Sequence, residues 1–337
     1  MKLQKLHKDY AGTLKEGFDF LKSETSRIFW GSYKTKIVAF FALLGAYHFT
    51  KRLISVASFS SRLLFQRRLD LLQRYGQNSY VMITGAAQGI GKTWAKRFIE
   101  MGFNLVIIDI DDSKLRATEK ELLELSPKAK IVTLVIDLSQ IESHISRILT
   151  ATENLDISIL VNNAGLFRYG PFDSIDKHDM LQIARVNTIA PLLLTREFIG
   201  RLRNRSKRSA IINMSSLSGI YPPRYFAVYA GTKSFLRYFS FCIEQENRDK
   251  IDVLNVAPGF VATQMTKLTV SWKAITTEDC IDGALRDLGR RSETMGSWKH
   301  AVFAKILGQK PSPLGDVLLN PIYMDLDALH RKSPKSE

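Results

Sequence analysis

The sequence predicts an α/β protein with a Rossmann-type, doubly wound parallel sheet and an N-terminal helical membrane-anchor extension. Three observations support this fold class. Short apolar runs alternate with amphipathic segments from residue 79 onward, which is typical of successive β–α–β units. The first of these runs enters a glycine-rich turn, and later runs end on polar or glycine residues. A separate apolar stretch with basic flanks lies well before the first predicted strand.

We expect three parts in the 337-residue chain. Residues 1–77 form a basic N-terminal region, residues 78–290 form the Rossmann domain, and residues 291–337 form a C-terminal extension. The hydrophobic anchor is centred on residues 37–50 and extends to residue 59 if the next apolar residues are included. Its 14-residue core is shorter than the roughly 20 residues that span a bilayer.

Three interpretations of the anchor stay open: a short or tilted membrane span, a helix lying in the membrane interface, and a soluble helix packed on the domain. The aromatic content and the basic residues on both sides favour membrane attachment. The chain has a net charge of +15, and residues 1–76 hold 14 Lys and Arg against 5 Asp and Glu. Such a region is attracted to anionic membrane lipid.

The remaining composition excludes several classes of site. No nucleic-acid-binding module accompanies the basic charge, so we expect no nucleic-acid partner. The two cysteines, Cys242 and Cys280, form no disulfide framework, which indicates a reducing compartment around the Rossmann domain. The six histidines show no metal-ligand spacing, so we expect no bound metal.

The glycine-rich turn after the first strand is suited to a dinucleotide. Gly85 allows a tight turn, Gly89 allows backbone to approach a pyrophosphate, and Gly91 allows the following helix to pack closely. That helix, expected over residues 92–101, would present free N–H groups to the phosphates. The predicted cofactor loop is completed by Gln88 and Ile90.

The second predicted strand, residues 104–108, ends at Asp109. An acidic residue about 20 positions beyond the glycines suits the ribose 2′-hydroxyl of NAD and would repel the 2′-phosphate of NADP. We therefore expect NAD as the cofactor, with NADP as the alternative. The other interpretation of Asp109 is a cap for the following helix, where Asp111 also lies.

Two further strands, expected over residues 131–136 and 157–161, end on residues that suit the same cofactor. The residues that follow them are Asp137 and Leu138, and then Asn163, Ala164 and Gly165. We place the first pair at the adenine edge, although each site also fits an ordinary junction between a strand and a loop. Because ligands bind outside the carboxyl ends of parallel strands, all these strand ends are expected to meet at one site.

Tyr229 and Lys233 lie four residues apart in a predicted helix, residues 227–247, and Ser216 precedes the tyrosine by thirteen residues. Side chains at i and i+4 share one helix face. A lysine ammonium beside a tyrosine favours the tyrosinate and lowers its pKa from about 10. The three residues predict an acid–base site in which Ser216 binds a substrate carbonyl. Taken alone, the pair also fits a solvated helix face.

In order and spacing, these motifs resemble those of the short-chain dehydrogenase/reductase family over about residues 78–265. The motifs that carry the resemblance are Thr84-Gly85-x-x-x-Gly89-Ile90-Gly91, Asn162-Asn163-Ala164-Gly165, Asn187, Ser216, Tyr229-x-x-x-Lys233 and Pro258-Gly259. The resemblance implies an NAD(P)-dependent oxidoreductase that moves a hydride between nicotinamide and a hydroxyl or keto group.

The resemblance also implies roles for single residues. Tyr229 would be the general acid in reduction and the base in oxidation, while Lys233 would hold the nicotinamide ribose and lower the tyrosine pKa. Ser216 would polarise the carbonyl, and Asn187 would position a water in the proton relay. The nicotinamide side would be lined by Pro258, Gly259 and Thr263.

A narrower similarity is to the membrane-bound branch that contains 17β-hydroxysteroid dehydrogenase type 12 and the very-long-chain 3-oxoacyl-CoA reductases. That branch favours NADPH, so Asp109 is a departure that leaves an oxidative role open. The similarity implies a hydrophobic lipid, steroid or fatty acyl substrate and allows a homodimer. It implies the endoplasmic reticulum membrane, with the catalytic domain on the reducing side, or alternatively a mitochondrial membrane. The competing hypothesis is a catalytically idle, cofactor-binding structural subunit of a membrane assembly.

The residues after Pro258-Gly259 are expected to form a substrate lid over residues 260–276. Its apolar side chains fit either a hydrophobic substrate or simple packing of the lid. They are Val261, Met265, Leu268, Val270 and Trp272. Residues 300–304 are expected to form the last strand, and residues 305–330 to extend the lid or pack on a membrane.

Overall fold

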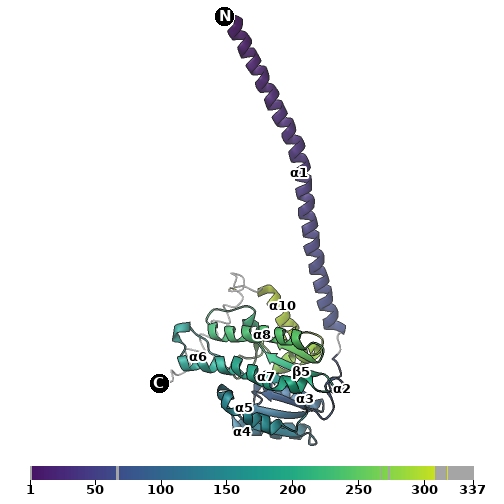
Figure 1. The fold of residues 1–337 in the computed structure, drawn as a ribbon, viewed down its shortest axis with the longest axis vertical. Coiled ribbons are helices and arrows are strands. Elements are labelled where there is room, and N and C mark those ends of the chain that lie inside the picture. Colours follow the sequence, from purple (N-terminus) through teal and green to yellow (C-terminus); the bar gives the residue numbers. More distant parts are fainter. Residues whose placement is uncertain (1, 66–67, 267, 272–273, 308–316, 318–337) are drawn as a thin grey trace. The chain divides into compact units, whose positions relative to one another are not determined.

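The computed structural model of the chain describes residues 2–65, 68–266, 268–271, 274–307 and 317 (Figure 1). The chain divides into two compact units, Met1–Gln66 and Arg67–Glu337. Each unit is described by itself below. The expected apolar residue Trp272 and most of residues 305–330 lie outside the described residues.

The first unit is one long helix, α1 (Lys2–Phe65). Its segment Tyr33–Ile54 is 22 residues long and contains an 18-residue window with a mean hydropathy of 1.4, none of which is buried. Among the described residues, this is the one helix that is long and apolar enough to cross a membrane. The predicted anchor core, residues 37–50, lies within that segment. The segment exceeds the roughly 20 residues that a span requires, because it includes Tyr33, the flanking lysines and residues up to Ile54.

The second unit is built on a parallel sheet of seven strands in the order β3-β2-β1-β4-β5-β6-β9. The strands are β1 (Tyr80–Thr84), β2 (Asn104–Asp109), β3 (Ile131–Val135), β4 (Ile157–Asn162), β5 (Ser209–Met214), β6 (Ile251–Val256) and β9 (Glu293–Thr294). The order reverses direction between β1 and β4, and this is where ligands bind in doubly wound folds. A separate parallel pair joins β7 (Phe260–Val261) to β8 (Ala274–Ile275).

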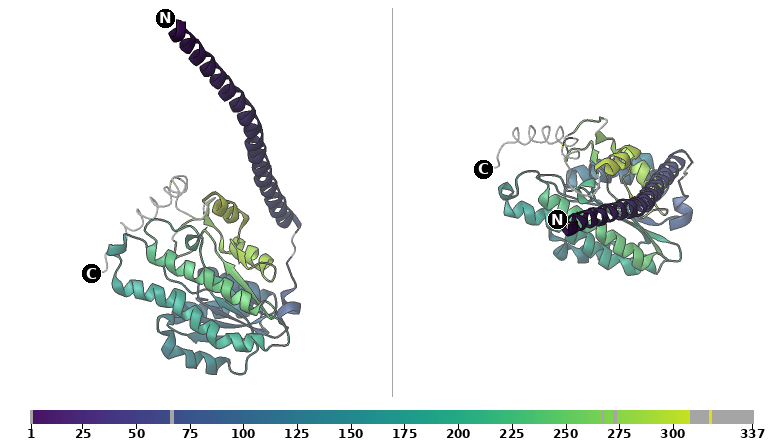
Figure 2. Two further views of the ribbon diagram at one scale, coloured as in Figure 1. Left: turned by 45° about the horizontal axis from the view of Figure 1, so that its top comes forward. Right: turned by 90° about the horizontal axis from the view of Figure 1, so that it is seen from above.

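Helices cover both faces of this sheet (Figure 2). The helices of this unit are α2 (Leu71–Tyr75), α3 (Gly89–Glu100), α4 (Asp112–Leu125), α5 (Ile141–Thr152), α6 (Lys177–Ala184), α7 (Ala190–Arg203), α8 (Ala227–Asn247), α9 (Thr277–Asp287) and α10 (Trp298–Leu307). Successive side chains of β1 enter opposite cores: Val81 and Ile83 pack with α3, α4 and α9, whereas Met82 packs with α5 and α7. This arrangement confirms the predicted doubly wound α/β fold.

The prediction of a last strand at residues 300–304 is wrong. These residues lie in α10, and the last strand is β9, which pairs with β6 through Asn255 opposite Glu293 and Val256 opposite Thr294. The reason is the spacing of the inward-facing residues of this segment. His300, Phe303, Ala304 and Leu307 are buried or partly buried, and the intervals i, i+3, i+4 and i+7 are those of a helix face.

Candidate active site

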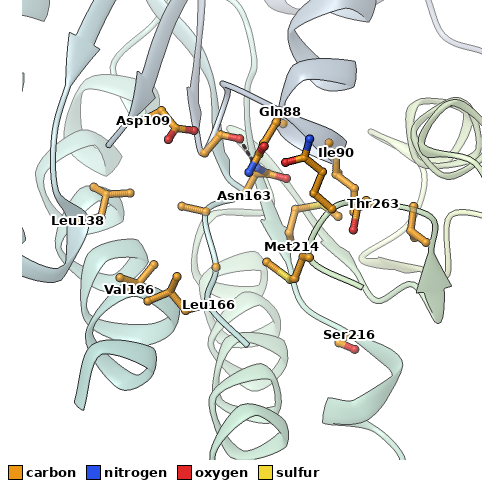
Figure 3. Close-up of a pocket in the computed structure, with 18 of the residues that line it drawn as sticks. Gln88, Ile90, Asp109, Leu138, Asn163, Leu166, Val186, Met214, Ser216 and Thr263 are labelled. Atoms are coloured by element: carbon orange, nitrogen blue, oxygen red, sulfur yellow. Dashed lines mark hydrogen bonds between the residues drawn. The ribbon is translucent and has the colours of Figure 1, made fainter. Parts of the chain in front are cut away.

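A cleft of about 360 Å³ opens at the carboxyl ends of the strands. It is lined by seventeen predicted site residues: Gly85, Gln88, Gly89, Ile90, Gly91, Asp109, Asp137, Leu138, Asn163, Ala164, Gly165, Ser216, Tyr229, Lys233, Pro258, Gly259 and Thr263. Among the predicted residues, Asn187 alone does not line it. Asp109 and Leu138 lie at one end of the cleft, and Ser216 lies at the other (Figure 3). The cleft therefore has the elongated form that a dinucleotide requires.

The glycines of the β1–α3 turn lie so close to neighbouring backbone that a side chain at these positions would collide with it. A Cβ on Gly91 would lie 1.9 Å from the Gly85 carbonyl oxygen, and a Cβ on Gly85 would lie 2.9 Å from the Ala164 Cα. Gly85 and Gly89 also have φ angles of 67° and 57°, which favour glycine. Helix α3 begins at Gly89, and Gln88 at its N-cap makes no side-chain cap, so the first N–H groups are open to an anion. The turn thus fits the pyrophosphate of a dinucleotide.

The turn is fastened to the end of β4 by two side chains. The Thr84 hydroxyl oxygen accepts hydrogen bonds from the backbone N–H groups of Asn163 (3.0 Å) and Ala164 (3.1 Å). The Asn163 amide donates to the carbonyl oxygens of Thr84 (2.8 Å) and Gly85 (3.1 Å). Asn163 therefore shapes the cofactor cleft by holding the glycine turn in place.

Asp109 points back to the glycine turn and does not cap the next helix. Its carboxylate accepts hydrogen bonds from the backbone N–H of Ala87 (2.9 Å), Ile110 (2.8 Å) and Asp111 (3.2 Å). The N-cap of α4 is Asp111, which accepts from the Lys114 N–H. The helix-cap interpretation thus belongs to Asp111, and Asp109 brings a negative charge to the cleft.

The cations near this end of the cleft are already paired with acids. Lys92 forms a salt bridge with Glu121 at 2.7 Å. Lys114 is paired with Asp111, and Arg116 with both Asp112 and Glu119. These three side chains therefore offer a 2′-phosphate little net positive charge.

Tyr229 and Lys233 lie on one face of α8, as predicted, but their electrostatics differ from the prediction. Burial raises the pKa of Tyr229 to about 12, with a smaller opposing effect from its hydrogen bond with Ser216. Burial lowers the pKa of Lys233, which is 4% exposed, to about 8. The Lys233 ammonium lies 5.6 Å from the centre of the Tyr229 ring and donates to the Met214 carbonyl oxygen at 2.7 Å. The expectation that Lys233 lowers the tyrosine pKa is therefore not met: desolvation raises this pKa, and the only opposing effect comes from Ser216.

Asn187 lies behind the cleft in a π-helical turn (Arg185–Ile189) between α6 and α7. Its side-chain oxygen accepts from the Leu166 N–H (2.8 Å), and its amide donates to the Leu166 carbonyl (3.0 Å) and the Thr232 hydroxyl (3.1 Å). It thus ties the loop after β4 to the residue preceding Lys233. Such π-turns within helices are frequent at functional sites, and the sequence analysis did not predict this one.

A second, apolar pocket of about 80 Å³ shares Ser216, Tyr229 and Gly259 with the cofactor cleft. Aromatic side chains make up a large part of its walls. They include Phe167, Tyr221, Phe226, Phe260 and Phe303. Most of these residues come from the loops after β4 and β5 and from α10, and the sequence analysis did not single them out.

The predicted lid contributes less to this pocket than expected. Of its five named apolar residues, Met265 lines both the apolar pocket and the cofactor cleft, and Val261 lines the cleft alone. Val270 is 61% exposed. The signal that was available for the pocket is the aromatic residues in the loops that follow two strands, Phe167 after β4 and Tyr221 after β5.

Comparisons with known proteins agree with this geometry. The family model of the short chain dehydrogenases matches residues 79–274. The very-long-chain 3-oxoacyl-CoA reductase of Homo sapiens is 30% identical over 243 residues, which cover 70% of this chain and 77% of the relative. A relative from Danio rerio, very-long-chain 3-oxoacyl-CoA reductase-A, is 32% identical over 229 residues, covering 66% and 71%.

Solved structures show the same fold. A 7beta-hydroxysteroid dehydrogenase superposes with a TM-score of 0.63 at 21% identity, covering 71% of this chain and 94% of that one. A 4-hydroxyisoleucine dehydrogenase complexed with NADH has a TM-score of 0.51 at 27% identity, covering 56% and 76%.

Proposed function

The chain belongs to the short-chain dehydrogenase family, and from this premise we propose that it interconverts a keto and a hydroxyl group on a long fatty acyl chain. It is an NAD(P)-dependent oxidoreductase of CH–OH and C=O groups. The observation that carries the proposal is the position of Ser216 and Tyr229, which line both the cofactor cleft and the aromatic pocket. A carbonyl at this junction would meet the cofactor on one side and bury its apolar chain on the other.

The substrate class rests on two observations. The pocket wall is aromatic and aliphatic, so it would bind a lipid chain. The relatives from several organisms are named very-long-chain 3-oxoacyl-CoA reductase. We therefore place a 3-oxoacyl thioester ahead of a steroid as the substrate.

The roles of the residues follow from their protonation. Tyr229, protonated at neutral pH because its pKa is raised to about 12, would donate a proton to the carbonyl oxygen. The Ser216 hydroxyl would hydrogen-bond the same oxygen and orient it. Lys233, largely ammonium below its pKa of about 8, would hold the nicotinamide ribose and stabilise the tyrosinate left behind. The bound nicotinamide supplies the hydride to the carbonyl carbon in reduction and accepts it in oxidation.

Asn187 would act at a distance from the substrate. It fixes the Leu166 loop and Thr232, next to Lys233, and would position a water that returns a proton to this end of the site. The dinucleotide itself would be held by the glycine turn, Asp137, Leu138 and Asn163, with Thr263 beside the nicotinamide. We infer that NAD is preferred over NADP, because Asp109 carries negative charge into the cleft.

We also propose a membrane location. The apolar segment Tyr33–Ile54 would anchor the chain, with the basic residues around it attracted to anionic lipid. We place this membrane at the endoplasmic reticulum, with a mitochondrial membrane as the alternative. The free cysteines fit a catalytic unit on the reducing side of either membrane. A homodimer stays a prediction.

The test is turnover of 3-oxohexadecanoyl-CoA with NADH by the full-length protein in detergent. Tyr229→Phe should lower kcat by at least about 100-fold, because the proton donor is lost, while the Kd for NADH changes less than about threefold. Tyr238→Phe is the matched control, since Tyr238 is on the same helix and is 62% exposed. Unchanged turnover in Tyr229→Phe would refute the mechanism.

The competing hypothesis predicts a different result. An idle subunit would purify in a stable, stoichiometric complex and would show no turnover on a panel of acyl thioesters and steroids. Measurable wild-type turnover that depends on Tyr229 excludes it.

A further inference from the structure

His300 is buried against Gly259, a residue that lines both the cofactor cleft and the apolar pocket. It lies in α10, is 3% exposed, and its Nδ1 accepts a hydrogen bond from the Gly259 N–H at 3.1 Å. A Cβ on Gly259 would lie only 2.9 Å from the His300 Cδ2. The imidazole thus packs directly on the Gly259 backbone, and glycine is the residue that leaves room for it.

This hydrogen bond defines the protonation of the ring. An Nδ1 that accepts from a backbone N–H carries no proton, so the imidazole is neutral with its proton on Nε2. The residue therefore serves as a fixed acceptor in this position. It lies below Gly259 and lines neither pocket itself.

The Pro258–Gly259 turn is joined to both halves of the site. Gly259 lines the cofactor cleft and the apolar pocket. The Pro258 carbonyl oxygen accepts from the Leu217 N–H at 2.8 Å, next to Ser216. On the other side, Phe303 and Leu307 line the apolar pocket from the helix that carries His300. His300 is therefore the link between the α10 wall and the turn at the reacting carbonyl.

We propose that His300 is a positioning residue that fixes the Pro258–Gly259 turn and so aligns the cofactor cleft with the apolar pocket. It acts through Gly259 and does not touch the substrate. The catalytic consequence rests on the proposed function, whereas the fixing of the turn does not.

Two substitutions of His300 distinguish the effect of its hydrogen-bond acceptor from the effect of its side-chain volume. His300→Asn keeps an acceptor oxygen near the place of Nδ1, and His300→Leu fills similar space without an acceptor. Amide hydrogen exchange of the peptide that contains Gly259 reads the turn directly. We expect exchange at least about tenfold faster in His300→Leu, and within about threefold of wild type in His300→Asn. Equal exchange in all three proteins would overturn the proposal.

Kinetics then test the consequence for catalysis, with 3-oxohexadecanoyl-CoA and NADH. Since a displacement of about 1 Å can cost about 100-fold in rate, His300→Leu should lower kcat by about 10- to 100-fold. The KM for NADH should change less than about threefold, and His300→Asn should recover most of kcat. An Asn variant as slow as the Leu variant, with both proteins folded, contradicts the role of the acceptor.

A second variant keeps the test decisive if His300→Leu does not fold. Gly259→Ala crowds the imidazole from the opposite side and should lower kcat to a similar extent, and adding His300→Asn, a smaller side chain, should restore part of it. No restoration would contradict the proposed contact. If the wild-type protein shows no turnover at all, the proposed function fails, and hydrogen exchange alone decides whether His300 fixes the turn.

Discussion

Burial acts in opposite directions on the two ionisable side chains at the centre of the site. It raises the pKa of Tyr229 to about 12 and lowers that of Lys233 to about 8, because desolvation disfavours the charged form of each. Tyrosine therefore stays a proton donor across the physiological range, and lysine is the group whose charge changes near it. The i,i+4 spacing predicted the pair, but the sequence does not report how deeply either residue is buried.

This difference predicts the pH dependence of reduction. The Lys233 ammonium is present below pH about 8 and is lost above it, so kcat/KM should fall as the pH rises through about 8. The fall would report Lys233, because Tyr229 keeps its proton until about pH 12. Arginine stays charged at this pH. In the residual activity of Lys233→Arg, the fall in kcat/KM should therefore move to higher pH. If kcat/KM of this variant still falls near pH 8, a group other than Lys233 causes the fall.

The negative charge of Asp109 predicts a preference for NADH over NADPH. In Asp109→Asn the charge is removed while the shape is kept, so the ratio of kcat/KM for NADH over NADPH should fall by at least about tenfold, or about 1.4 kcal/mol. Glu124→Gln is the control, because Glu124 is an exposed acid on α4 and does not line the cleft. A wild-type protein that strongly prefers NADPH would refute the inference from Asp109.

At the scale of elements, the sequence predicted those with a strong local signal. The helix expected at residues 227–247 is α8, and the strand expected at residues 104–108 is β2 with Asp109 added. Long amphipathic patterns and continuous apolar runs specify such elements by themselves. By contrast, β9 has only two residues and forms through its pairing with β6. The residues taken for a strand, 300–304, are too few to show the helical spacing that extends to Leu307 in α10. The aromatic pocket could not be predicted, because it joins loops and a helix distant in sequence.

The packing of α3 on the glycine turn gives a prediction at this scale. Gly91→Ala places a Cβ 1.9 Å from the Gly85 carbonyl oxygen, so helix and turn must move apart. We expect a loss of about 1–3 kcal/mol in the free energy of unfolding, from overpacking, and weaker NADH binding. Gly200→Ala in α7 is the matched control, because a Cβ there meets nothing within 4 Å. It should be neutral or stabilise by up to about 1 kcal/mol. Chemical denaturation and NADH titration of both variants measure the contrast.

At the scale of the whole molecule, the two units have different physical characters. The second unit buries two apolar cores around its sheet, whereas large apolar side chains of the first unit, among them Phe40, Phe41 and Leu43, are more than 60% exposed. An exposed apolar surface of this kind is a membrane or protein interaction site in a stable protein. The anchor core predicted at residues 37–50 lies within Tyr33–Ile54, but its short length left the choice between a span and an interfacial helix open.

Carbonate extraction distinguishes these possibilities in the intact chain. If Tyr33–Ile54 spans the bilayer, the wild-type protein stays in the membrane pellet. Replacing both Leu43 and Leu44 with Arg adds about 2.5–3.5 kcal/mol per residue to the cost of insertion near the helix centre. Even the most apolar 18-residue window of the segment has a mean hydropathy of only 1.4, so insertion would not tolerate that cost and the double variant should move to the supernatant.

Ile110→Arg is the charge control, since Ile110 is 64% exposed in the second unit, and it should stay in the pellet. Wild-type protein in the supernatant would argue for an interfacial or soluble helix. A double variant that stays in the pellet would instead assign membrane attachment to another part of the chain.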